Sequence, residues 1–286
     1  MYDSIGLYVR NPSLALTVVR LWKLGFGQKS VPVDHTNHAS CLMGLPVLNP
    51  IGLAAGIDRT GCLLSGTIKA GYGFTEVGSV TPKTLRWTLH YLVRARKYGV
   101  GMTIGVNIRA TPGETEAAAI TSYLVCLRKL LPVADYVVLN LTAFYSHECC
   151  FDNLAWLARL LLSAQNERDY YHDKVGKRIP IAIKIPLSCG LPGGQKSSLE
   201  LCRQKGLDGI LVVSPTDYDD NHICALLESV KVIVKDLDIV SIGGVATTDH
   251  VASRLAAGAA AVQVFGSVLK QGPFVPRYLL KDLPSS

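Results

Sequence analysis

The sequence predicts an α/β protein, a (β/α)8 barrel with a short N-terminal helical segment. The first observation behind this prediction is that short apolar runs alternate eight times with helix-forming stretches along the 286 residues, as in parallel strands joined by crossover helices. The second is that polar residues or glycines recur where these apolar runs end. In a barrel those ends meet at one face, where ligands bind. The length also agrees, since such a barrel needs about 250 residues.

The eight expected strands are short and apolar, with turn residues on either side. They are predicted at residues 51–55, 74–78, 103–107, 136–140, 181–185, 209–213, 239–242 and 261–264. Helical stretches fall between them, for example at 114–129, 153–164 and 197–205. We find no linker within this part of the chain, so residues 46–286 are expected to form one barrel domain.

Residues 1–45 are expected to form the separate helical segment. Asn11-Pro12 is a typical helix start, Gly25 a typical end, and one face between them is apolar, with Leu14, Val18, Leu21 and Trp22. Two interpretations remain. A basic helix with Trp and Leu on one side can lie at a membrane surface, or the helix can pack across the bottom of the barrel.

Composition narrows the choice of protein class. The chain is 49% hydrophobic and 18% charged, with a formal net charge of +7, which suits an anionic cofactor, anionic lipid or nucleic acid without choosing among them. Its eight cysteines form no C-x-x-C and lie mostly in apolar surroundings, so we expect reduced, buried thiols. Neither a secretory leader nor an apolar run of about 18 residues is found, which favours a cytoplasmic protein without a membrane span.

Lys184 is the most informative single residue, because it lies inside the apolar run Ile-Ala-Ile-Lys-Ile-Pro. A buried ammonium is costly unless an anion or several acceptors meet it. At the mouth of a barrel, a flavin or a substrate anion could be that partner. The alternative is a structural ion pair with a neighbouring Asp.

Two glycine turns follow the last two strands, at Gly243-Gly244 and at Gly266-Ser267. Glycines between a strand and a helix leave backbone N–H groups uncovered at the positive end of the helix, which can bind a phosphate. Two such turns on consecutive strands match the phosphate site that follows strands 7 and 8 of a barrel. The alternative is that these glycines only permit tight turns and close packing.

The sequence resembles the class 2 dihydroorotate dehydrogenases, which are membrane-associated, FMN-dependent barrels. The likeness runs from about residue 11 to 273 and is carried by MGLPVLNPIGLAAGIDRTG, FTEVGSVTPK, IGVNI, ADYVVLNLT, IPIAIKI, LDGI and IGGV…LAAGAAAVQVFGSVLKQGP. It implies oxidoreductase chemistry on CH–CH bonds in pyrimidine biosynthesis. It also implies a small-molecule substrate, a quinone or other electron acceptor, and peripheral contact with the inner membrane through the N-terminal helix.

The resemblance also assigns flavin contacts residue by residue. It implies that Ala54, Ala55 and Gly56 lie along the isoalloxazine, with Ser79 beside them. Asn107 and Asn140 would hydrogen-bond the ring, and Lys184 would face its N1–O2 edge. The glycine turns would hold the phosphate through Gly243, Gly244, Gly266 and Ser267. No metal is implied.

The sequence also departs from the family pattern. The family's Asn-Arg-Met-Gly-Phe-Asn segment, which covers the substrate, is missing between residues 82 and 105, and its Gly-Gly-Leu-Ser-Gly phosphate loop is missing before the seventh strand. The family's fourth-strand loop reads Asn-hydrophobic-Ser-Ser-Pro-Asn, and its second Ser is the general base, whereas residues 140–145 here read Asn-Leu-Thr-Ala-Phe-Tyr. Ala143 at the base position cannot accept a proton. Thr142, Tyr145 and Arg59 are the remaining polar candidates above the flavin face, and Tyr145 would need a lowered pKa, for which Arg59 is the neighbour.

Three functions follow from this pattern. One is an FMN oxidoreductase acting on a different or modified substrate, and another is a pseudoenzyme that keeps the barrel for binding or regulation. The third is an RNA-modifying FMN barrel of the dihydrouridine synthase type, suggested by the basic run at 83–97. That family uses a catalytic-loop Cys and a further RNA-binding domain, and neither is found. A solvated helix face explains these charges better, so no nucleic acid is expected.

Overall fold

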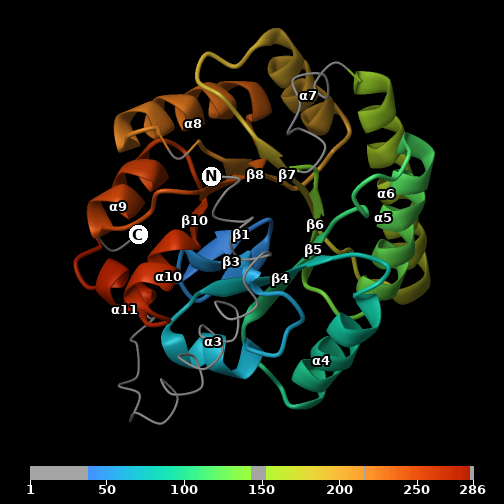
Figure 1. Cartoon of the computed structure of the whole chain (residues 1–286), viewed down its shortest axis with the longest axis horizontal. Coiled ribbons are helices and arrows are strands. Elements are labelled where there is room, and N and C mark those ends of the chain that lie inside the picture. Colours follow the sequence, from blue (N-terminus) through green and yellow to red (C-terminus); the bar gives the residue numbers. More distant parts are fainter. Residues whose placement is uncertain (1–37, 143–152, 216, 284–286) are drawn as a thin grey trace.

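The computed structural model describes residues 38–142, 153–215 and 217–283, and these form a closed barrel of parallel strands surrounded by helices (Figure 1). The strand order around the barrel is β10-β3-β4-β5-β6-β7-β8-β9. Strands that follow one another in sequence are neighbours, and β10 closes the barrel against β3 through the pairs Val262–Ile51 and Val264–Leu53. The predicted (β/α)8 architecture is confirmed.

All eight predicted strands are present. They are β3 (Ile51–Asp58), β4 (Phe74–Val80), β5 (Thr103–Ile108), β6 (Tyr136–Asn140), β7 (Ile181–Pro186), β8 (Gly209–Val213), β9 (Asp238–Ile242) and β10 (Ala261–Val264). The largest difference from the prediction is that β3 continues beyond Ala55, through Gly56, to Asp58. Its register against β4 shifts between Leu53 and Asp58, so the small residues form an irregular end of the strand at the barrel mouth.

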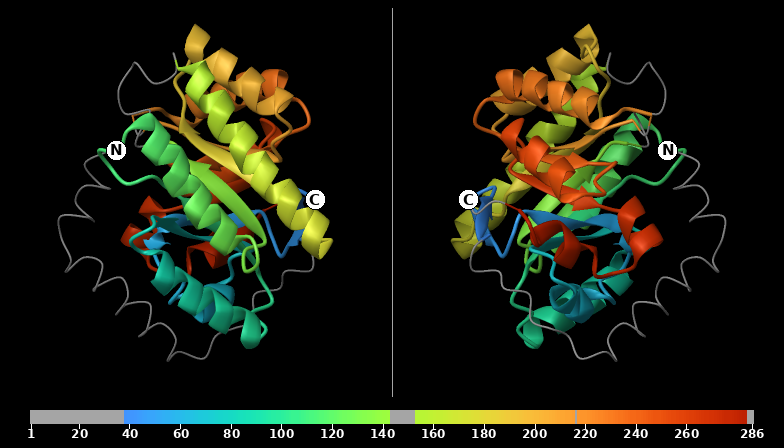
Figure 2. Two further views of the ribbon diagram at one scale, coloured as in Figure 1. Left: turned by 90° about the vertical axis from the view of Figure 1, so that its right-hand side faces the viewer. Right: turned by 90° about the vertical axis from the view of Figure 1, so that its left-hand side faces the viewer.

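The helices form the outer layer (Figure 2). They are α3 (Leu64–Ala70), α4 (Leu85–Lys97), α5 (Glu116–Leu130), α6 (Leu154–Val175), α7 (Gly193–Gln204), α8 (Asp220–Val234), α9 (Thr248–Ala256), α10 (Gly266–Gln271) and α11 (Val275–Leu280). The prediction for α6 was too short. Its polar second half stays helical until Gly176, whose left-handed backbone ends it.

Large side chains fill the end of the barrel where the strands begin. Phe74 and Tyr136 are fully buried in the interior cluster, and each is accommodated by a glycine. A Cβ on Gly52 would lie 2.3 Å from the Phe74 ring, and a Cβ on Gly105 would lie 2.2 Å from the Tyr136 ring. Because these rings occupy the end where the strands begin, the polar side chains lie toward the carboxyl ends of the strands.

A short hairpin precedes the barrel. β1 (Ser40–Leu42) and β2 (Leu45–Val47) pair in antiparallel fashion, and Met43 between them packs against Gly209 at the start of β8. The helix expected at residues 11–25 lies outside the described residues, so the division at residue 45 stays a prediction. Within the described ranges, no helix is both long and apolar enough to cross a bilayer.

The cysteine prediction is only partly correct. The six cysteines in the described residues are free, as expected. However, only Cys126 and Cys202 are buried, while Cys41 and Cys62 are exposed. The expectation of mostly buried thiols is therefore wrong, because apolar neighbours in sequence do not decide which side of a loop or hairpin a side chain faces.

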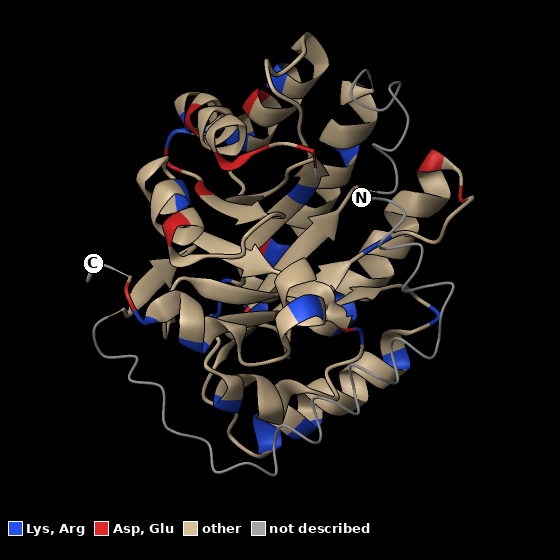
Figure 3. Cartoon of the chain, turned by 60° about the vertical axis from the view of Figure 1, so that its left-hand side comes forward, with Lys and Arg blue, Asp and Glu red and all other residues tan. Residues whose placement is uncertain are grey.

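Most of the basic run at 83–97 lies in α4, on the outside of the barrel (Figure 3). Arg86, Arg94 and Lys97 are exposed, and Arg86 lies over the Trp87 ring, 4.6 Å from its centroid. Arg96 pairs with Asp135 at 2.8 Å. This arrangement is that of a solvated helix face.

Candidate functional site

Three polar side chains from neighbouring strands meet at the carboxyl end of the barrel. The Ser79 hydroxyl donates to Asn107 Oδ1 at 2.8 Å, and Asn140 Nδ2 donates to Ser79 Oγ at 3.0 Å and to Asn107 Oδ1 at 2.9 Å. The three come from β4, β5 and β6. All three were predicted from sequence as site residues, and the structure brings them together.

Thr142 fixes the other end of the Asn140 amide. Both its backbone N–H and its hydroxyl donate to Asn140 Oδ1, at 3.0 and 2.8 Å. The buried Tyr123 hydroxyl donates to the Asn140 carbonyl oxygen at 2.6 Å. Asn140 therefore has one orientation, with oxygen toward Thr142 and nitrogen toward Ser79. Ala143 and Tyr145 lie outside the described residues.

Lys184 lies beside this cluster, since β7 places it in register with Asn140. Its side chain is buried, with the residue only 7% exposed. No hydrogen bond or ion pair engages its ammonium within the described part of the chain. Burial lowers the pKa of Lys184, and the carboxylate of Glu76 partly opposes that effect. The sequence left open a structural ion pair between Lys184 and a neighbouring Asp. Among the described residues, the acid that acts on Lys184 is Glu76 instead.

Glu76 is a buried acid that the sequence prediction missed. It is 0% exposed and accepts hydrogen bonds from Gln263 Nε2 at 2.6 Å, Tyr136 Oη at 3.2 Å and Asn107 Nδ2 at 3.3 Å. Burial raises the pKa of Glu76, while the charge of Lys184 and these hydrogen bonds act against the rise. The signal was available, because Glu76 and Gln263 interrupt apolar strands in the same way as Lys184.

Two arginines follow the strands on either side of β4. Arg59 is exposed and comes directly after β3. Arg109 comes directly after β5, and its backbone N–H donates to the Val80 carbonyl at 2.8 Å. Burial, and then the positive charge of Arg59, lower the pKa of Arg109. Arg59 was predicted from the sequence as a site residue, whereas Arg109 was not. Together they make this part of the mouth electropositive.

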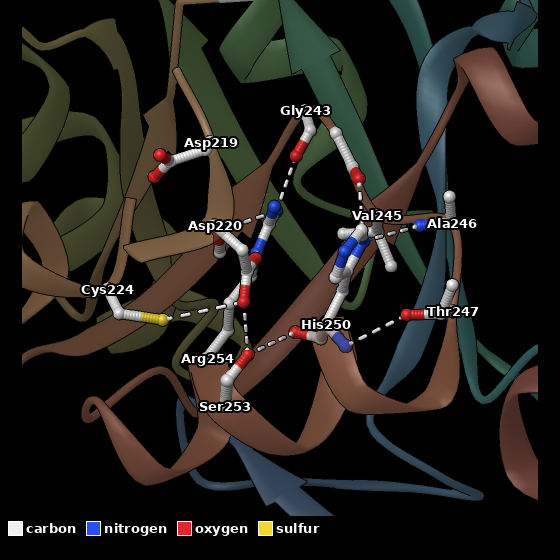
Figure 4. A network of polar contacts seen from close by, with 12 residues as sticks. Asp219, Asp220, Cys224, Gly243, Val245, Ala246, Thr247, His250, Ser253 and Arg254 are labelled. Atoms are coloured by element: carbon white, nitrogen blue, oxygen red, sulfur yellow. Dashed lines mark hydrogen bonds and ion pairs between the residues drawn. The ribbon is translucent and has the colours of Figure 1, made fainter. Parts of the chain in front are cut away.

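The two predicted glycine turns also meet. In the first turn three successive carbonyls each contact a side chain. The Gly243 carbonyl accepts from Arg254 Nη1 (Figure 4), that of Gly244 lies 3.1 Å from His250 Nδ1, and that of Val245 accepts from the Ser267 hydroxyl. Ser267 comes from the second turn, so its hydroxyl joins the two turns and is already engaged by the protein.

The backbone amides of the first turn are left for a ligand. Among the described residues, the N–H groups of Gly244 and Val245 have no acceptor, although Val245 is only 3% exposed. In a trans peptide the carbonyl and the following N–H point in opposite directions. The side chains that hold the carbonyls of Gly243 and Gly244 therefore turn these two amides the other way. Gly266 has open space around the position of a Cβ.

Comparisons with known proteins identify relatives of this chain. Dihydroorotate dehydrogenase (quinone) of Pseudomonas syringae pv. syringae (strain B728a) is 30% identical over 292 residues, covering 82% of each chain. The chain belongs to the dihydroorotate dehydrogenase family. The corresponding protein of Pseudomonas savastanoi pv. phaseolicola is 29% identical over 82% of each chain. The family model described as dihydroorotate dehydrogenase matches residues 219–286, which include both glycine turns and Arg254.

Solved structures support the same fold. Dihydroorotate dehydrogenase from Eimeria tenella, in complex with ferulenol, has a TM-score of 0.81 and 21% identity, covering 95% of this chain and 90% of that one. Its ligand-free form gives the same TM-score at 20% identity. The resemblance found in the sequence is thus confirmed at the level of the family.

Proposed function

We propose that this chain is an FMN-dependent oxidoreductase on the dihydroorotate dehydrogenase scaffold, acting on a small-molecule substrate other than ordinary dihydroorotate. The observation that carries the proposal is Lys184, a buried ammonium beside Asn140 without a hydrogen-bond partner in the described residues. A buried ammonium needs hydrogen-bond acceptors as well as an opposite charge, and Glu76 acts on Lys184 only through its charge. The N1–O2 edge of a reduced flavin would provide both.

The surroundings of Lys184 suit a flat ring. The end of β3 supplies small residues, Ala54, Ala55 and Gly56, and a Cβ on Gly56 would lie 3.1 Å from the Phe265 ring. A larger side chain there would reduce the room beside Phe265. The serine and asparagine cluster lies at the same ends of the strands in fixed orientations, and we propose that Ser79, Asn107 and Asn140 contact the ring.

The phosphate of FMN fits the first glycine turn. The amides of Gly244 and Val245, which have no acceptor among the described residues, can donate to phosphate oxygens, as glycine turns next to helices do in other barrels. The expected roles of Gly243, Gly244 and Gly266 rest on this argument. Ser267 would contribute through its backbone, because its hydroxyl donates to Val245.

FMN, when bound, supplies the acceptor for the electron pair removed from the substrate. The residues of this chain orient it and shape its charge. Lys184 would stabilise negative charge, while Asn107 and Asn140 hold the ring. We propose Arg59, Thr142 and Tyr145 as the polar groups that face the substrate, with Arg59 favouring a charged form of Tyr145.

Two features argue against ordinary dihydroorotate oxidation. Ala143 occupies the position of the family's general base, and a base contributes roughly 10²–10⁴-fold in rate. The family's Asn-Arg-Met-Gly-Phe-Asn segment, which covers the substrate, is missing between residues 82 and 105. These same features favour a second candidate, a pseudoenzyme of this family with a binding or regulatory role.

The electron acceptor is proposed from the relatives, which are named as quinone enzymes. We propose a quinone or a similar acceptor, a role near pyrimidine biosynthesis, and a cytoplasmic protein held at the inner membrane through residues 1–45. No nucleic acid or metal is part of the proposal.

The test is a titration of the purified protein with FMN, followed by visible absorbance and thermal unfolding. We expect a bound flavin spectrum and a raised midpoint, since ligand at 100 times its Kd adds about 2.7 kcal/mol to the free energy of unfolding. FAD serves as a control of similar ring chemistry and larger size. A protein that stays colourless with excess FMN and shows no midpoint change would contradict the proposal.

A further inference from the structure

Arg254 is a buried cation that the proposed reaction does not use. It lies on α9 and is only 1% exposed, which makes it one of the largest fully buried side chains among the described residues. Burying a guanidinium is costly unless its N–H groups find acceptors. Its position must therefore be explained by what it contacts.

Those contacts connect three elements. Arg254 Nε donates to Asp220 Oδ1 at 2.9 Å, at the start of α8. Its Nη1 donates to the Gly243 carbonyl and, at 3.4 Å, to the Ser241 hydroxyl of β9. Asp220 is itself held by the Ser253 hydroxyl at 2.5 Å (Figure 4). The guanidinium is thus fixed on one side by an acid and holds the glycine turn on the other.

The contact with Gly243 decides the direction of the next amide. Because the peptide between Gly243 and Gly244 is planar and trans, a carbonyl held toward Arg254 turns the Gly244 N–H away from it. Gly243 and Gly244 have φ values of 110° and 68°, a region in which glycine has wide freedom. Without an anchor, such a turn would sample several orientations of its amides.

Arg254 also lies directly beneath the turn. A Cβ on Gly244 would be 3.1 Å from Arg254 Nη2, so no side chain separates the guanidinium from this backbone. Its positive charge is partly balanced by Asp220, whose pKa is held low: burial acts to raise it, but the hydrogen bonds from Ser253 and Arg254 outweigh that effect.

We infer that Arg254 is a positioning residue for the phosphate of the bound flavin, acting through the Gly243 carbonyl, with Asp220 holding the guanidinium in place. This inference rests on the proposed function and extends it. Arg254 would orient the remaining phosphate site of a chain from which the family's Gly-Gly-Leu-Ser-Gly phosphate loop is missing. The Gly244 amide then faces the ligand before it binds, next to the Val245 amide that the His250 contact orients, which lowers the entropy cost of binding.

The test compares FMN with riboflavin, which has the same ring and no phosphate. Kd values are measured for both ligands by fluorescence quenching in the wild type, Arg254→Met, Arg254→Lys and Asp220→Asn. We expect the FMN Kd of Arg254→Met to rise roughly tenfold or more, as for loss of a hydrogen bond to a charged group, while the riboflavin Kd stays within about twofold. Arg254→Lys, which can still donate to Gly243, should recover part of the preference, and Asp220→Asn should fall between.

Arg168 provides a matched control. It is another buried arginine paired with acids, Asp169 at 2.8 Å and Asp208 at 3.6 Å, and it has no contact with the glycine turns in the described residues. Arg168→Met should lower the melting temperature without changing the ratio of the FMN and riboflavin Kd values. If Arg254→Met leaves that ratio unchanged, or lowers both affinities equally, the inference is wrong. If the wild type binds neither flavin, the proposed function fails first.

Discussion

At the scale of single residues, the charged and polar groups inside the barrel mouth define the site. Lys184 and Glu76 are both buried, and burial moves their pKa values toward each other, lowering that of the lysine and raising that of the acid. Glu76 has three hydrogen-bond donors around it, whereas none of the described residues accepts from Lys184. The asymmetry suggests that Glu76 serves the structure and Lys184 serves a ligand.

Lys184→Met should lower the midpoint potential of the bound flavin. The substitution keeps an unbranched apolar stem and removes the charge that would stabilise the reduced form. A hydrogen bond to a charged group contributes about 1.5–3 kcal/mol, which corresponds to roughly 30–65 mV for a two-electron couple. The measurement is a redox titration under argon, with the exposed Lys196→Met as a control that should leave the potential unchanged.

The same experiment distinguishes the alternative role for Lys184. If the lysine only balances Glu76, Lys184→Met would change the melting temperature and leave the potential as it was. A melting curve of the apoprotein is therefore recorded beside each titration.

At the scale of elements, one pair of helices is joined by side chains that also reach the glycine turn of the site. α8 and α9 are connected by the ion pair of Asp220 with Arg254 and by the hydrogen bond from Ser253. The loop after β3 is held by hydrogen bonds as well, because the buried Asp58 carboxylate accepts from the backbone N–H groups of Gly61 and Leu63 at 2.8 and 2.9 Å. These contacts hold the loops that follow β3 and β9 in position at the mouth.

Asp220→Asn should lower the free energy of unfolding at neutral pH by about 1–3 kcal/mol, because a charge-assisted hydrogen bond is replaced by a neutral one. The pKa of Asp220 in the folded state lies below its ordinary value of 3.8. Its carboxylate therefore stabilises the fold above about pH 4, and that stabilisation is lost as the pH falls through the lower, folded-state pKa.

The measurement is urea unfolding of both proteins at several pH values from 3 to 7. The difference between wild type and variant should be constant near neutrality and shrink below about pH 4. A difference that persists unchanged to the lowest pH would show that the charge of Asp220 is not what stabilises the pair.

At the scale of the whole molecule, the flavin half and the substrate half of the mouth differ in how well they keep the family's pattern. The described side of the mouth has its serine, its asparagines and its lysine in mutual contact or register. On the substrate side, the positions of the general base and of the covering segment are altered in the sequence. The protein as a whole is thus expected to bind the cofactor and to process dihydroorotate poorly.

Dihydroorotate should leave the flavin oxidised when it is mixed anaerobically with FMN-loaded protein in a stopped-flow spectrometer. Ala143 cannot take the proton, which removes a factor of roughly 10²–10⁴. Dithionite, which reduces the flavin directly, is the positive control. Rapid bleaching by dihydroorotate would instead require another residue, Thr142 or Tyr145, to act as the base.

The sequence by itself determined the barrel and the places where ligands would meet it. Alternating apolar runs and helical stretches define parallel strands locally, so the strand ends at Asn107, Asn140 and Gly243 could be located without coordinates. Lys184 could be identified for the same reason, because a charge inside an apolar strand is visible in one dimension.

Only the tertiary structure decided which of these groups face one another. The hydrogen bonds of Glu76 span up to 187 positions in sequence, and Arg254 reaches Asp220 and Gly243 from the next helix. Such pairs depend on barrel closure and on the rotation of each helix about its axis, which no local pattern encodes. Burial then determines their effect, since a charge acts strongly only where water is excluded.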